Sequence, residues 1–140
     1  MKYVIQQGLP EDAKKIREEV FMREQGFQNE FDALDETAWT LVLYDGSDAA
    51  GCCQLILSKD GSSAVIRRVA VPKAFRGRSY GSLLLQEAEK WLCQHGVQRI
   101  SLSAQVRVRP FYEQLSFTTV GQEYLDEWCP HIKMTKNVQE

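Results

Sequence analysis

Apolar positions along the first half of the chain predict a series of short strands. Residues 2–7 alternate between apolar and polar side chains, which is the pattern of a half-buried strand. Strands are also predicted at residues 39–44, 50–58 and 64–71, because these runs are rich in apolar and β-branched residues and turn signals separate them. The connecting turns are short, so we expect the last three strands to form an antiparallel meander.

Other segments follow helical periodicity. A first helix is expected to begin around Pro10 and to end at Gly26, with apolar residues spaced along one face. A longer amphipathic helix is expected over residues 83–95, followed by a strand at 99–103. Because this helix joins two strands, the strand before it and the strand after it should be parallel. A third, short helix is expected around residues 109–115.

Two segments have weaker patterns. Residues 27–37 carry several carboxylates and predict a short helix or an ordered loop. Near the C-terminus, strands are predicted at residues 118–120 and 131–136. The stretch between them, Gly121 to Pro130, is rich in aromatic and acidic residues and is interpreted as a loop.

This order of elements predicts an α/β (α+β) fold with a mixed, mostly antiparallel central sheet and helices on both faces. The 140 residues are enough for one domain with a real core. No linker, internal repeat or low-complexity segment divides the chain, so we expect residues 1–140 to form a single domain.

Composition excludes some classes of protein. The formal net charge of -2 argues against a general nucleic-acid binder, which would usually be clearly basic. No apolar run approaches the roughly 20 residues of a membrane helix, and no signal-peptide pattern opens the chain. We therefore expect a cytoplasmic protein that binds neither nucleic acid nor membranes.

The four cysteines are interpreted as structural thiols in a reducing compartment. None of them forms a C-x-x-C pair. Cys129 and His131 alone do not reach the four ligands, or three ligands and a water, that a zinc site needs. The sequence therefore predicts no metal.

The segment from Val71 to Ser82 carries the strongest functional signal. It is a basic, glycine-bearing turn between a predicted strand and the start of a predicted helix. Backbone N–H groups converge at such a turn, the helix dipole adds partial positive charge, and glycine lets an anion approach closely. A phosphorylated ligand is therefore the first hypothesis, although a solvated basic face is the alternative when charge alone is considered.

Within this turn, Arg76-Gly-Arg-Ser-Tyr-Gly81 resembles the acyl-CoA-binding motif of the GNAT superfamily of N-acetyltransferases. Ser79 stands where that motif usually has glycine, which would strain the turn if its φ must be positive. Pro110-Phe-Tyr-Glu-Gln-Leu-Ser-Phe117 resembles a second family segment, again with serine, Ser116, in place of glycine. Segments near both termini are similar to the small, single-domain ElaA-like branch.

The resemblance implies where acetyl-CoA would bind. The pantetheine arm would lie along Val69, Ala70 and Val71, where the sheet opens between two diverging strands. The pyrophosphate would lie on the turn and the first residues of the helix, namely Arg76, Gly77, Arg78, Ser79, Tyr80, Gly81 and Ser82, with the two arginines adding charge-assisted contacts.

The resemblance also implies catalytic roles. Tyr112 matches the position of the general acid that protonates the leaving thiolate, with a tyrosine packed between helix and sheet as the alternative. His131 and Glu123 are candidates for the general base, and Glu30 and Glu36 are more distant ones. The carboxylates of residues 27–37 are interpreted either as a lip that attracts cationic amines or as a solvated loop.

The leading hypothesis is therefore an acetyl-CoA-dependent N-acetyltransferase that acts on a primary amine of a small molecule or a protein. A CoA-binding regulatory module without turnover is the alternative, because Ser79, Ser116 and Gln105 depart from the family pattern. The sequence leaves a homodimer through the C-terminal strands open.

Overall fold

Residues 1–138, which the computed structural model describes, form one seven-stranded sheet with the order β1-β2-β3-β4-β5-β7-β6. The strands are β1 (Lys2–Gln7), β2 (Trp39–Asp45), β3 (Asp48–Leu57), β4 (Ser63–Ala70), β5 (Arg99–Gln105), β6 (Thr118–Asp126) and β7 (Cys129–Asn137). Every neighbouring pair is antiparallel except β4 and β5. The predicted mixed, mostly antiparallel sheet and the parallel pair around the long helix are confirmed.

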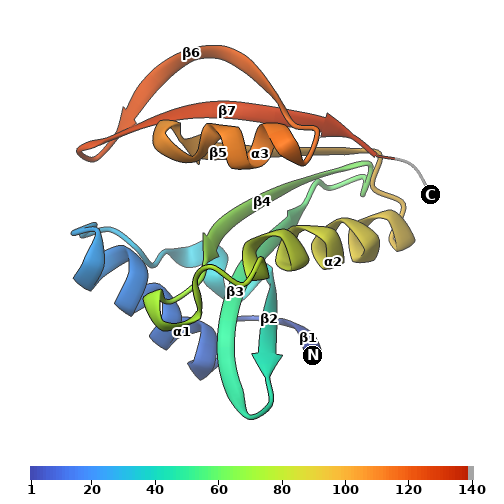
Figure 1. The fold of residues 1–140 in the computed structure, drawn as a ribbon. Helices are drawn as coiled ribbons and strands as arrows, with labels where there is room; N and C mark the ends of the chain where they lie inside the picture. Colours follow the sequence, from blue (N-terminus) through green and yellow to red (C-terminus); the bar gives the residue numbers. More distant parts are fainter. Residues whose placement is uncertain (139–140) are drawn as a thin grey trace.

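Helices cover both faces of this sheet. The first face carries α1 (Glu11–Arg17), which runs on into the π-helix η1 (Glu18–Glu24), and the second carries α2 (Tyr80–Gln94) and α3 (Arg109–Gln114). The short 3-10 helices are η2 (Ala33–Glu36), η3 (Lys73–Phe75) and η4 (Val106–Val108). In Figure 1, β5, β7 and β6 form an upper group of strands, and α2 lies below them beside β4.

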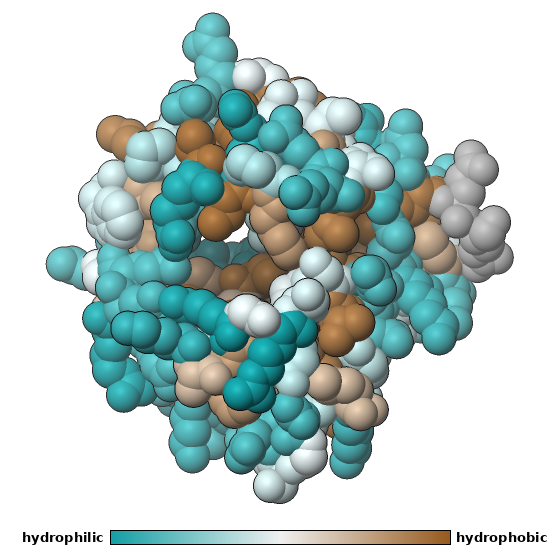
Figure 2. All heavy atoms as spheres, in the orientation of Figure 1, coloured by the Kyte–Doolittle hydropathy of each residue, from teal (hydrophilic) through white to brown (hydrophobic). Residues whose placement is uncertain are grey.

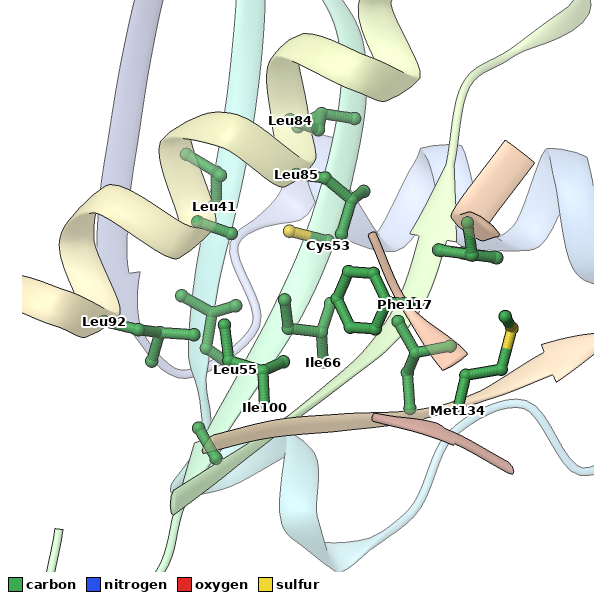
Figure 3. Close-up of a cluster of buried hydrophobic side chains, with 14 of the residues drawn as sticks. Leu41, Cys53, Leu55, Ile66, Leu84, Leu85, Leu92, Ile100, Phe117 and Met134 are labelled. Atoms are coloured by element: carbon green, nitrogen blue, oxygen red, sulfur yellow. The ribbon is translucent and has the colours of Figure 1, made fainter. Parts of the chain in front are cut away.

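Two apolar clusters hold the layers together. The larger one joins α2 to the sheet through residues such as Leu84 and Leu92, packed against Leu55, Ile66 and Ile100 (Figure 3). The smaller one lies under α1 and is formed by Ala13, Ile16, Val20, Val42, Cys52 and Ala70. Cys52 and Cys53 are neighbours on β3 and belong to different clusters, because successive strand residues point to opposite faces.

The C-terminal hairpin corrects the sequence prediction. Residues 121–126 continue β6, and Cys129 and Pro130 begin β7, so the predicted loop from Gly121 to Pro130 is reduced to a turn at Glu127 and Trp128. Every residue of β6 is exposed, since it is an edge strand. Without a buried face it has no reason to show the alternation by which a strand is predicted from sequence.

The helix predicted at residues 83–95 begins three residues earlier, at Tyr80. The ambiguous segment 27–37 contains one 3-10 turn, η2, with a capping box between Asp32 and Asp35. No helix within residues 1–138 has both the length and the apolar character needed to cross a bilayer.

Candidate active site

A large cavity lies where β4 and β5 separate. The two strands pair only at Ser63–Val65 and Arg99–Ser101 and then diverge, which confirms the opening that the family resemblance implied. The cavity between them has a volume of about 760 Å³. Figure 2 shows it as a hollow near the centre of the molecule.

The wall formed by β4 suits an extended ligand. Val69, Ala70 and Val71 all line the cavity, and the register of β4 with β5 ends before them. Backbone N–H and C=O groups on that edge therefore have no partner strand and can pair with an extended chain of amide groups.

The turn that follows β4 leads directly into α2. Gly77 has φ +81°, Ser79 has φ +62°, and the helix begins at Tyr80 with no side chain capping it. The first intrahelical bond is donated by Leu83 to the Ser79 carbonyl, so the N–H groups of the residues before Leu83 are not used inside the helix. Gly77 and residues 79–82 all line the cavity. The free backbone N–H groups at this end of the cavity can therefore donate hydrogen bonds to an anion.

Ser79 adopts the left-handed conformation that the motif's usual glycine would accept without strain. We expect Ser79→Gly to raise the free energy of unfolding by up to about 1 kcal/mol, because the Cβ penalty disappears and the serine side chain makes no capping bond. Urea unfolding measures this change. Ser82→Gly, inside α2, is the control and should lose about 0.5 kcal/mol. Equal losses of the free energy of unfolding in Ser79→Gly and Ser82→Gly would contradict the claim that the backbone is strained at Ser79.

Two arginines of the turn differ in their surroundings. Arg76 lines the cavity, but its guanidinium forms a bidentate ion pair with Glu24 at 2.6 Å and donates from Nε to the Val71 carbonyl at 2.9 Å. An incoming pyrophosphate would share Arg76 with this carboxylate. Arg78 is not among the lining residues and lies 3.7 Å from Asp45.

Tyr112 reaches the cavity from α3. It is 8% exposed and packs edge-to-face against Phe111 and Phe117, with ring centroids 5.0 and 6.0 Å away. Burial raises the pKa of its phenol strongly, so the hydroxyl is protonated at neutral pH. The hydroxyl of Tyr112 can therefore donate a hydrogen bond into the cavity.

His131 also lines the cavity, from β7. It is buried between Tyr124 and Phe27, and its Nδ1 lies 2.9 Å from the Cys129 carbonyl oxygen. A carbonyl only accepts, so we assign the hydrogen to Nδ1, which leaves the lone pair of the neutral ring on Nε2. His131 is thus held in one tautomer that can accept a proton.

Glu123, the other main candidate base, lies on the exposed strand β6 and does not line the cavity. Its place in the fold gives no support to a catalytic role.

Two carboxylates of the acidic segment, those of Glu30 and Asp35, are buried in ion pairs and are therefore neither solvated nor part of an open lip, whereas Asp32 and Glu36 are exposed. Glu30 and Asp35 are 4% and 5% exposed and pair with the buried guanidinium of Arg17 at 2.8 and 2.7 Å. Gln54 donates to Asp35 at 2.7 Å. Since Glu30 is committed to these bonds, it is not an available base, and Glu36 does not line the cavity.

Two neighbouring arginines of β4 extend this cluster. Arg67 forms a bidentate pair with Asp32 at 2.7 and 2.8 Å and also donates to Gln54. Arg68 lies 3.0 Å from the Glu30 carboxylate. Three arginines therefore meet three carboxylates beside the cavity, and we call these six residues the ion-pair cluster: Arg17, Glu30, Asp32, Asp35, Arg67 and Arg68.

The comparisons with known proteins agree with this geometry. Residues 6–138 match the family model described as the acetyltransferase (GNAT) domain. The chain belongs to the GNAT acetyltransferase family. It is 32% identical over 129 residues to an uncharacterized N-acetyltransferase of Bacillus subtilis, YjcF, covering 90% of this chain and 91% of that protein.

Solved structures share the fold of the acetyltransferase. Escherichia coli ElaA superposes with a TM-score of 0.86 at 23% identity, over 96% of this chain and 98% of that one. An aminoglycoside 6'-N-acetyltransferase complexed with coenzyme A superposes with a TM-score of 0.76 at 14% identity, over 98% and 97%. The resemblance to the ElaA-like branch is thus confirmed at the level of the fold.

The sequence did not predict the contacts between residues 27–29 and the hairpin turn at Glu127 and Trp128. The Glu127 carboxylate accepts from the backbone N–H groups of Gln28 and Asn29 at 3.0 to 3.2 Å, and the Trp128 ring lies 5.6 Å from that of Phe27. These contacts join segments about 100 residues apart in sequence, and no local sequence pattern predicts them. Phe27, Asn29 and Glu127 of these segments line the cavity.

Within residues 1–138 of the acetyltransferase, no group of three or more histidine, cysteine or acidic side chains is arranged to hold a metal ion.

Proposed function

We propose that the protein transfers the acetyl group of acetyl-CoA to a primary amine by direct attack. The observation that carries this proposal is the cavity between β4 and β5, which ends at the uncapped start of α2. An unpaired strand edge and a backbone anion site fit the amide-rich arm and the pyrophosphate of one ligand. When bound, acetyl-CoA supplies an activated thioester.

The proposed roles divide between the two faces of the sheet. On the α2 and α3 face, Val69–Val71 would hold the pantetheine arm, and Arg76, Gly77 and residues 79–82 would hold the pyrophosphate, with Arg76 contributing through its side chain. On the α1 face, the cavity wall formed by Glu30, Arg68 and His131 would receive the acceptor amine. Placing the two ligands on opposite faces brings amine and thioester together at the opening of the sheet.

His131 would act as the general base and Tyr112 as the general acid. Nε2 of His131 takes the proton that the amine loses as its nitrogen bonds to the carbonyl carbon. The Tyr112 hydroxyl donates to the sulfur as the carbon–sulfur bond breaks, and the proton passes to the thiolate. The products are an amide and free CoA, and the proton held by His131 must then pass, through solvent, to the deprotonated Tyr112 before the next turnover.

The experiment that tests this proposal measures the release of CoA thiol from acetyl-CoA, with and without a panel of primary amines. Amine-dependent release with matching N-acetylated product supports it. Binding of acetyl-CoA with no release on any amine would favour a CoA-binding regulatory module.

Cytoplasmic localisation and a homodimer through β6 and β7 remain predictions. Buried thiols at Cys52 and Cys53 fit a reducing compartment.

A further inference from the structure

Arg68 occupies an unusual backbone position on the acceptor side of the cavity. Its φ is +57° in the middle of β4, where the register with β3 shifts between Cys52 and Gln54. In a regular strand Arg67 and Arg68 would point to opposite faces. The bulge instead brings both side chains to the ion-pair cluster. Bulges that redirect a side chain and residues held at positive φ are concentrated at functional sites.

Arg67 and Arg68 differ in how many of their guanidinium nitrogens donate hydrogen bonds. Arg67 commits Nε to Gln54 and both terminal nitrogens to Asp32. Arg68 directs Nε and Nη2 to Glu30. Within the part of the chain that the structure describes, Nη1 of Arg68 makes no hydrogen bond. Arg68 lines the cavity and its side chain is 22% exposed.

The charge of Arg68 is also only partly compensated. Its one carboxylate partner, Glu30, is shared with Arg17, which lies 2.8 Å from the same oxygen atom. Burial and the neighbouring cations Arg67 and Arg17 lower the pKa of Arg68. A bound anion would compensate the remaining positive charge of Arg68.

Cations, in contrast, have no buried carboxylate left to bind at this end of the cavity. Glu30 is engaged by two arginines, and Glu127 accepts from two backbone N–H groups. Asp126, the other acidic lining residue near the hairpin turn, is exposed. Glu127 is exposed as well, so the buried part of the wall presents the positive charge of Arg68, while the carboxylates of Asp126 and Glu127 are open to solvent. This buried charge favours an acceptor with a carboxylate over the cationic amines that an acidic lip at residues 27–37 would attract.

We infer that the acceptor is a small primary amine that also carries a carboxylate, as an amino acid does, and that the free Nη1 edge of Arg68 binds this carboxylate. The inference rests on the proposed acetyl transfer and names its substrate class. A planar guanidinium matches a carboxylate in shape and charge, and buried charge-assisted bonds of this kind are strong. Arg68 would then set specificity without taking part in proton transfer.

The test uses matched pairs of acceptors, each an amino acid and its α-amide, with rates compared per concentration of unprotonated amine. We expect the wild type to prefer the carboxylate form at least about tenfold in kcat/KM, mainly through KM. Arg68→Gln should abolish the preference, and Arg68→Lys should keep part of it. Arg99→Gln removes a charge at an exposed position outside the cavity and should leave the preference unchanged.

Calorimetric binding of acetyl-CoA to each variant shows that it is folded. Turnover without a preference for the carboxylate, or a preference that survives in Arg68→Gln, overturns this inference and leaves acetyl transfer standing. No turnover of any pair by a wild type that acetylates another amine of the panel overturns this inference alone. No CoA release with any amine overturns the proposed function, and the inference with it.

Discussion

An Arg17→Gln variant is expected to lose about 3–5 kcal/mol of the free energy of unfolding. Arg17 is 1% exposed, and its guanidinium holds the carboxylates of Glu30 and Asp35. A neutral amide would leave two buried carboxylates without their principal counter-charge. The free-energy cost of this unpaired buried charge is larger than the net stabilisation that the intact ion pairs give compared with apolar side chains in their place. Urea unfolding followed by circular dichroism measures the loss.

Arg23→Gln provides the matched control. Arg23 lies further along the same continuous helical segment, is exposed, and should change stability by less than about 0.5 kcal/mol when replaced. A similar small change at Arg17 would mean that the ion-pair cluster is not a buried network in solution.

The second large effect is expected in catalysis. Tyr112→Phe should lower kcat by about 100-fold with little change in the affinity for acetyl-CoA. The phenylalanine keeps the ring contacts with Phe111 and Phe117, and only the hydroxyl that would protonate the thiolate is lost. Thiol release at saturating amine gives kcat, and calorimetry gives the affinity.

Tyr3→Phe removes a hydroxyl from β1, outside the cavity, and should retain wild-type turnover. If Tyr112→Phe is as active as the wild type with a good acceptor, another group protonates the leaving thiolate.

The parts of the site that could be predicted from sequence are those specified by local chemistry. The turn before α2 is visible because glycine, basic residues and a strand-to-helix change coincide within a few positions. Tyr112 could be placed because a short motif surrounds it. The sequence raises the question of whether the φ of Ser79 is positive, but only the structure answers it.

The acceptor side could not be predicted in this way. Arg17 pairs with carboxylates 13 and 18 residues away, and Arg68 with one 38 residues away. Composition alone makes residues 27–37 look solvated, since acidic residues are rarely buried unless paired, and the partners come from other elements. The bulge at Arg68 depends on strand register, which the sequence of β4 does not display.

The central claim is that the cavity between β4 and β5 binds acetyl-CoA with its pyrophosphate at the start of α2. Calorimetric titration of the wild type, Gly81→Asn and Gly81→Asp with acetyl-CoA tests this most directly. A Cβ at Gly81 comes 3.2 Å from the Phe111 ring in both variants, and only the aspartate adds a negative charge at the anion site. We expect micromolar or tighter binding to the wild type and a far greater loss of affinity in Gly81→Asp than in Gly81→Asn. No detectable binding to the wild type, or equal losses in the two variants, would contradict it.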